Sequence, residues 1–222
     1  MTLLQFSPPL YGWVRRASIE KVFLTQRLSL VFSQALPLGL QLARLCAMPT
    51  LQIPISANDF HKGQLDAPLQ IVHYGDFECP YSRALSVSIA QLQSEEGDQL
   101  LYVFRPFPLT DIHPHALSAT RAAYAANDQN QFWPMYAALF QQNALGPTFL
   151  KIYAQKIGLD TDQFENDFRS DKYDSLIESS VQDARASGAH GTPTIFVNGQ
   201  FHDNREGMWQ LERLHAAVRD AR

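Results

Sequence analysis

The chain has 222 residues, which is enough for one large domain or two small ones. Apolar residues make up 45% of it and charged residues 18%, a balance that is typical of globular proteins and excludes a chain disordered throughout. The formal net charge of −4 argues against a nucleic-acid partner. Because no uninterrupted apolar run reaches about 18 residues, we predict no membrane span.

The chain contains two cysteines, Cys46 and Cys79. Two cysteines form at most one internal disulfide, which excludes a small disulfide scaffold and a zinc site with four thiolates. No cluster of His, Asp or Glu has the spacing of metal ligands. We therefore expect neither a metal nor a bound cofactor, and one cysteine is a candidate for chemistry of its own.

The first 47 residues hold five basic groups and one acidic group, whereas the remainder is acidic. This change places a boundary near Met48. We predict that residues 1–50 are a poorly ordered extension, or upstream sequence added by a wrong start codon, in which case Met48 is the first residue. Arg27 followed by Leu28–Leu40 imitates a secretory signal poorly, so an export signal or a membrane-surface helix stays an alternative.

From Leu51 onward the pattern is that of a folded domain. Strands are predicted at 69–74, 100–104 and 194–197, and a helix at 80–94. The stretch 114–127 and further apolar faces up to Gly188 predict a series of helices. Asn198-Gly199 is the pair that a two-residue hairpin turn prefers, so Phe201 opens a return strand before a last helix at 208–218. This order predicts an α/β fold in which helices at about 113–188 are inserted into a sheet framework.

Cys79 lies between a predicted strand and a predicted helix. Pro80 suits the first helical position, and a thiol there faces unpaired backbone N–H groups and the positive end of the helix dipole. Both favour the thiolate, which is the form that attacks a disulfide. The Ser82 hydroxyl, one turn on, can donate to that thiolate, whereas negative charge on Asp76 and Glu78 opposes it. The alternative is a buried, inert cysteine.

Three segments, His73–Ser82, Phe104–His113 and His190–Gly199, together resemble the DsbA-like thioredoxin family, most closely its cytoplasmic bacterial members. The resemblance covers about 51–222. It implies a thioredoxin-like fold with a helical insertion and a nucleophilic cysteine at Cys79. It also implies a cis proline facing that cysteine and a set of residues around the sulfur. The proline is Pro193, and the surrounding residues are Thr192, Phe77, Pro80 and Tyr81.

The family pattern has a second cysteine where this chain has Ser82. The motif therefore cannot close its own disulfide, and we predict a thiol–disulfide oxidoreductase that forms mixed disulfides with protein thiols or glutathione through Cys79 alone. Cys46 is a distant candidate for a resolving thiol. His190 is either a stabiliser of the thiolate or an exposed loop residue, and His113 and His115 are expected to be packing or surface residues.

Two other functions fit parts of the pattern. A glutathione-dependent transferase or isomerase of the kappa-class type would use a serine in the motif, although Ser82 occupies the wrong end of it. A non-redox module would hold an extended peptide in a groove lined by Thr192 and Pro193. We expect a cytoplasmic monomer or weak dimer, or a periplasmic protein if the first segment is an export signal.

Overall fold

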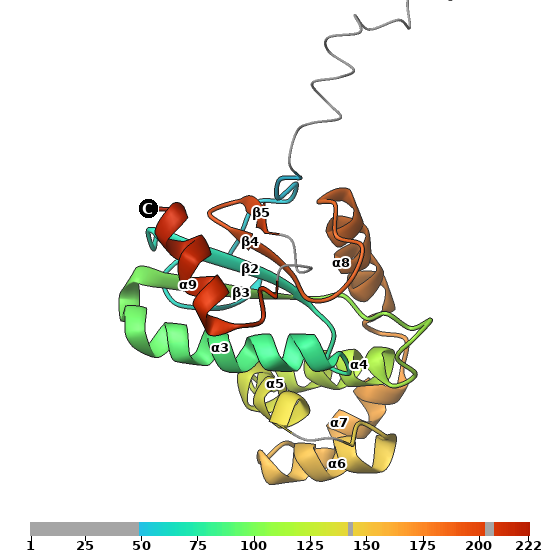
Figure 1. Ribbon diagram of the computed structural model, residues 1–222. Helices are drawn as coiled ribbons and strands as arrows, with labels where there is room; N and C mark the ends of the chain where they lie inside the picture. The colour runs from blue at the N-terminus through green and yellow to red at the C-terminus, as the bar shows by residue number, and fades with distance from the viewer. Residues whose placement is uncertain (1–48, 142–143, 203–206) are drawn as a thin grey trace, which may run out of the picture. The chain divides into compact units, whose positions relative to one another are not determined.

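The computed structural model describes residues 49–222 except 142–143 and 203–206 (Figure 1). The extension predicted for residues 1–50 falls almost entirely outside the described residues, as does Cys46. The strands are β1 (Phe60–Lys62), β2 (Leu69–Gly75), β3 (Leu100–Pro106), β4 (Thr194–Val197) and β5 (Gln200–His202). The helices are α3 (Pro80–Glu96), α4 (Ala116–Asn127), α5 (Phe132–Gln141), α6 (Pro147–Lys156), α7 (Thr161–Arg169), α8 (Asp174–Ala186) and α9 (Leu211–Asp220), with a 3₁₀ turn at Gly97–Gln99.

The strands form one mixed sheet in the order β1-β3-β2-β4-β5. β2 and β3 run parallel and are connected by α3, whereas β1, β4 and β5 pair antiparallel with their neighbours. The hairpin between β4 and β5 turns at Asn198 and Gly199, which both have positive φ as the predicted turn requires. The helices α4 to α8 lie between β3 and β4 in the chain, and the predicted α/β class with inserted helices is confirmed.

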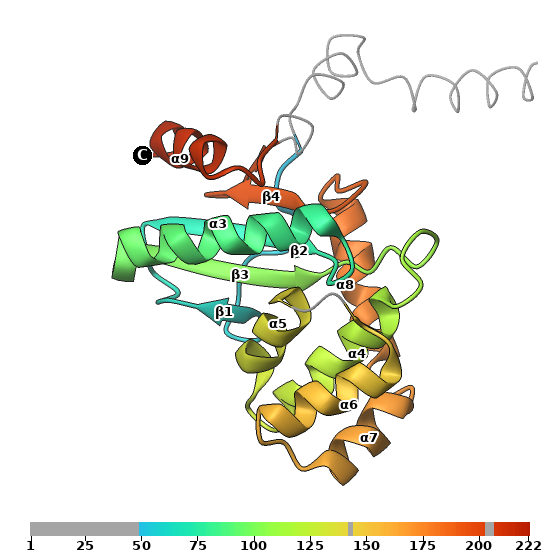
Figure 2. The ribbon, with the colours of Figure 1, turned by 60° about the horizontal axis from the view of Figure 1, so that its bottom comes forward.

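Helices cover both faces of the sheet, so its central strands are apolar on both sides (Figures 1 and 2). Ile71 and Tyr102 face the cluster that contains α3, α5 and α9. Val72 and Val103, one position along each strand, face the cluster that contains α8. The predicted apolar face of α3 is confirmed, because Leu85, Ile89 and Leu92 are all buried. This packing fixes the carboxyl end of β2, from which the chain enters the Cys79 turn.

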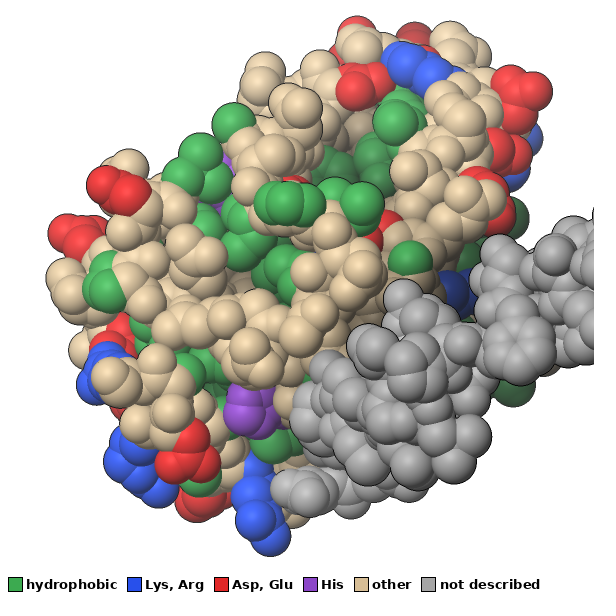
Figure 3. All heavy atoms as spheres, turned by 90° about the horizontal axis from the view of Figure 1, so that it is seen from above, with side chains coloured by type: hydrophobic (Ala, Val, Ile, Leu, Met, Phe, Trp, Pro, Cys, Tyr) green, Lys and Arg blue, Asp and Glu red, His purple; other side chains and the backbone are tan. Residues whose placement is uncertain are grey.

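The surface of the described residues shows no block of one charge on the face in Figure 3, where acidic and basic side chains are interspersed around the edge. Within the same residues, no helix combines the length and apolar character needed to cross a bilayer.

Gly75, the last residue of β2, is predicted to tolerate no side chain. A Cβ there would lie 2.5 Å from Cε2 of Phe104 and 2.6 Å from Nε2 of His73, two rings that are completely buried. We expect Gly75→Ala to lower the free energy of unfolding by about 1–3 kcal/mol through overpacking. Urea titration measures this loss. Gly191→Ala is the control, since a Cβ at Gly191 meets nothing within 4 Å, and equal stability of the two variants would contradict the prediction.

Candidate active site

Cys79 is the N-cap residue of α3 and has extended backbone angles, with φ −71° and ψ 122°. Pro80 occupies the first helical turn, as the sequence predicts. The sulfur therefore lies at the positive end of the helix dipole. Its S–H donates to the backbone oxygen of Thr192 at 3.2 Å, and only 4% of Cys79 is exposed.

The segment that faces the sulfur is positioned by the sheet. β4 pairs with β2 so that Thr194 lies opposite Tyr74, near the end of β2 from which the Cys79 turn departs. Thr192 and Pro193 immediately precede β4 and are joined by a cis peptide bond. Two segments separated by more than 100 residues are thus brought together, and Thr192 presents its main chain to Cys79.

Ser82 is completely buried one turn after Cys79. Its Oγ accepts a hydrogen bond from the backbone N–H of Asp76 at 3.3 Å. The expected hydrogen bond between the Ser82 hydroxyl and the Cys79 sulfur is not formed in this structure. Ser82 instead forms a hydrogen bond with the turn that precedes Cys79. Its hydroxyl proton can still donate to another acceptor.

The two acidic residues of the turn bind the loop that follows β3. The buried carboxylate of Asp76 accepts hydrogen bonds from the backbone N–H groups of Glu78 and Leu109 and contacts Nδ1 of His113, each at 2.8 Å. Glu78 accepts from the backbone N–H of His115 at 2.6 Å and contacts its Nδ1 at 3.0 Å. Because both carboxylates have these partners, their charge is directed toward the loop. The matched spacing, two residues apart in each segment, is a signal that sequence reasoning missed.

Phe77 does not shape the surface around the sulfur, which corrects the sequence prediction. It is completely buried, and its ring lies 5.0–5.1 Å from those of Phe104 and Phe140. The family resemblance placed Phe77 at the surface around the sulfur, but burial in the core stabilises the large apolar ring more.

Two other predicted residues are exposed beside Cys79. Pro80 is exposed, and Tyr81 is 51% exposed with its ring 4.5 Å from that of Trp209. Sequence reasoning did not find Trp209, because it comes from the distant segment before α9. His190 is exposed, and no contact joins it to the sulfur in the described structure.

His73, on β2, is a buried histidine that the sequence analysis did not single out as a site residue. It is completely buried, and this burial lowers its pKa from 6.5 to about 3. Nδ1 of His73 lies 2.9 Å from the hydroxyl of Tyr102, which lies 2.9 Å from that of Tyr136. Burial raises the pKa of both tyrosines. All three side chains are therefore neutral at pH 7.

The low pKa of His73 predicts a pH dependence of stability. Above pH 6.5 the residue is neutral in both states, whereas at lower pH only the unfolded chain takes up the proton. We expect the wild-type protein to lose about 2 kcal/mol more unfolding free energy than His73→Gln between pH 7 and pH 5. Urea titrations at the two pH values measure this difference, and equal losses in both proteins would refute it.

Within the described residues, no group of three or more His, Cys, Asp or Glu side chains could hold a metal ion. A cavity of about 410 Å³ lies between β3, α4 and α8, and Cys79 is not among its lining residues. The site thus offers a single thiol at a helix N-terminus, beside the main chain of Thr192 at the bend that precedes β4.

Comparison with known proteins agrees with this arrangement. Residues 56–218 match the family model described as thioredoxin. The curated relatives include Na⁺/H⁺ antiporters named NhaA 1. That of Mycolicibacterium gilvum is 39% identical over 190 residues, which are 84% of this chain and 29% of the relative. That of Salinispora arenicola is 39% identical over 173 residues, 77% of this chain and 26% of the relative. The chain therefore spans less than a third of these relatives.

Solved structures share the fold at low sequence identity. BdbD from Bacillus subtilis superimposes with a TM-score of 0.67 at 18% identity, over 79% of this chain and 98% of that protein. The thiol-disulfide exchange protein α-DsbA2 from Wolbachia pipientis superimposes with a TM-score of 0.62 at 20% identity, over 75% and 89%. These matches confirm the predicted thioredoxin-like fold of DsbA type.

Proposed function

Because the chain belongs to the thioredoxin family, we propose that it is a thiol–disulfide oxidoreductase that works through Cys79 alone. The observation that supports this most directly is the position of the sulfur, at the N-terminus of α3 and 3.2 Å from the Thr192 carbonyl. Ser82 occupies the place one turn later where a second thiol would be needed to close a disulfide within the motif. The substrate would be a protein thiol or disulfide, or glutathione, and no bound cofactor is required.

The proposed reaction needs one sulfur of the protein. The Cys79 thiolate attacks a disulfide, forms a new S–S bond with one half of it and releases the other half as a thiolate. A second external thiolate then attacks the mixed disulfide and regenerates the Cys79 thiolate. The backbone oxygen of Thr192 accepts a hydrogen bond from the Cys79 S–H. We therefore expect the main chain of a polypeptide substrate to lie beside Thr192.

The experiment is adduct formation with glutathione disulfide, followed by mass spectrometry of the intact chain. We expect one glutathione on Cys79 in the Cys46→Ser protein and none on that residue in a chain that also carries Cys79→Ser. Catalysed reduction of a glutathionylated peptide should depend on Cys79 in the same way. A folded protein that gains no adduct would contradict the proposal, and glutathione conjugation that survives Cys79→Ala would favour the transferase alternative.

The names of the relatives suggest where the domain works. We infer that this thioredoxin domain operates next to a membrane transport protein of the antiporter type, because the relatives that match 77–84% of the chain carry that name. The periplasmic alternative is the proposed location, because a protein that shares the fold at 19% identity is described as a periplasmic thioredoxin-like protein. Labelling of Cys79 by a membrane-impermeant maleimide, in intact cells that carry the Cys46→Ser chain, tests it: labelling before the cytoplasmic membrane is opened is expected, and protection until then would place the domain in the cytoplasm.

A further inference from the structure

Two buried polar atoms on the segments that lead to the Cys79 site lack a hydrogen-bond partner. Nε2 of His73 and Oγ1 of Thr192 are inaccessible to solvent and make no hydrogen bond within the described structure. The Ser82 hydroxyl accepts from Asp76 N–H and keeps its own proton for a further bond. Buried polar atoms are nearly always paired in proteins, so a group of them beside a nucleophile calls for a functional explanation.

The position of His73 directs Nε2 toward the cysteine turn. Residues 73 and 75 share one face of β2, and a Cβ on Gly75 would lie 2.6 Å from Nε2. The next residue, Asp76, donates its N–H to Ser82 Oγ and accepts from the N–H of Cys79. The unpaired nitrogen therefore lies beside the last residue of β2, next to the turn that holds both Ser82 and Cys79.

The hydrogen-bond chain behind His73 indicates which ring nitrogen carries the proton. A neutral imidazole has one donor and one acceptor. If Tyr136 donates to Tyr102 and Tyr102 donates to Nδ1, every hydroxyl proton in the chain is used and only the Nε2–H lacks an acceptor. In the opposite direction, Nδ1–H would donate to Tyr102 and Tyr102 would donate to Tyr136. Nε2 would then lack a donor and the Tyr136 hydroxyl proton would lack an acceptor, and the described structure provides neither. The first direction leaves fewer unpaired groups.

We propose that His73 is a positioning residue for the Cys79 thiolate. Its Nε2–H donates to one buried water, which donates to the Ser82 hydroxyl, and this orients the Ser82 proton toward the sulfur once it is ionised. Ser82 then accepts from Asp76 N–H and from the water held by His73 and donates to Cys79, so that the full hydrogen-bonding capacity of its hydroxyl is used. Since the ring is neutral, it supplies a donor without placing a charge under the thiolate.

The surrounding charges do not compete with this role. The charged or titratable side chains around the described site are Asp76 and Glu78, which contact His113 and His115, the exposed His190, and Arg83, which follows Ser82 on α3. The groups packed against His73 from β3 and α5 are the hydroxyls of Tyr102 and Tyr136, both neutral at pH 7. The inference rests on the proposed function, because it concerns the reactivity of the same sulfur.

The test is the pH profile of Cys79 alkylation by iodoacetamide in the full chain carrying Cys46→Ser. We expect His73→Leu to move the profile to higher pH and to slow alkylation at pH 7 roughly three- to tenfold, the effect of losing one hydrogen bond to the charged form. His73→Gln, which keeps an N–H donor, should recover part of the rate. Tyr102→Phe should slow alkylation because it no longer fixes the tautomer, whereas Tyr136→Phe should leave the profile unchanged.

The outcomes separate this inference from the proposed function. A folded His73→Leu protein with the wild-type profile would overturn the inference alone. Should that variant fail to fold by circular dichroism, the tyrosine pair decides, and identical profiles for Tyr102→Phe and Tyr136→Phe would overturn it. If wild-type Cys79 reacts no faster than the cysteine of an unfolded peptide, the proposed function fails and this inference fails with it.

Discussion

Ser82→Cys is expected to convert the protein from a single-thiol to a two-thiol enzyme. The new sulfur would lie one turn after Cys79, in the place now held by a buried hydroxyl that is bound to the Asp76 N–H. After glutathione adds to Cys79, the introduced thiolate would attack the Cys79 sulfur, form the internal disulfide and release glutathione. Oxidised Ser82→Cys should therefore carry no adduct and lack two hydrogens, whereas the parent keeps one glutathione.

The same variant should gain an activity that the parent lacks. We expect it to oxidise a reduced peptide dithiol stoichiometrically without glutathione, because a protein disulfide stores two electrons. Both proteins should carry Cys46→Ser, and Ser82→Ala is the matched control because it removes the hydroxyl without adding a thiol. Persistence of the glutathione adduct on Ser82→Cys would show that the second position cannot reach Cys79. A Cys46–Cys79 disulfide in the wild-type chain would contradict the single-thiol mechanism.

Much of the sheet framework could be predicted from sequence because its signals are local. The apolar run of β2 and Pro80 after Cys79 locate a strand and a helix start within a few residues. Asn198-Gly199 locates the hairpin turn in the same way. β1 has only three residues and pairs with β3 across about 40 positions, so its sequence carries no pattern that marks it.

The site was less predictable because its contacts are non-local. The sequence shows Asp76 and Glu78 as charges close to a thiol, but only the fold reveals that the loop with His113 and His115 binds them. Phe77 has the same neighbours in sequence and yet belongs to the core. For His73, strand alternation gives a buried face, whereas its neutral state depends on complete burial by residues from elsewhere in the chain, and its partner Tyr102 lies 29 residues away. The roles of these side chains therefore depend on tertiary contacts, which the periodicity of the sequence does not predict.

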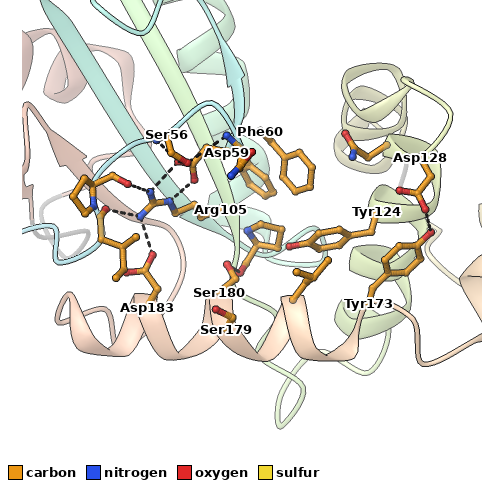
Figure 4. Close-up of a pocket in the computed structure, with 17 residues that line it drawn as sticks. Ser56, Asp59, Phe60, Arg105, Tyr124, Asp128, Tyr173, Ser179, Ser180 and Asp183 are labelled. Carbon is orange, nitrogen blue, oxygen red and sulfur yellow. Dashed lines mark hydrogen bonds and ion pairs between the residues drawn. The ribbon is translucent and has the colours of Figure 1, made fainter.

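The largest loss of stability is expected at Arg105, on β3, which is 6% exposed (Figure 4). Its guanidinium binds both oxygens of Asp59 at 2.7 and 3.1 Å and Oδ2 of Asp183 at 2.8 Å. It also donates to the hydroxyl of Tyr74 and to the carbonyls of Ile53 and Pro54. One side chain therefore joins the segment before β1, the sheet and α8, because the five N–H groups of its planar guanidinium serve six acceptor atoms.

Arg105→Ala should lower the free energy of unfolding by about 3–5 kcal/mol, because it leaves two largely buried carboxylates, whose side chains are 12% and 11% exposed, without a counter-charge. Arg105→Lys should recover only part of this, since an ammonium cannot form the paired bonds to Asp59. Urea unfolding with an unchanged m-value measures the loss. Arg169→Ala is the matched control: its ion pair with Glu165 is exposed, and we expect a change of less than about 1 kcal/mol. If Arg105→Ala were no more destabilising than this control, the buried network would not be what holds α8 and the segment before β1 to the sheet.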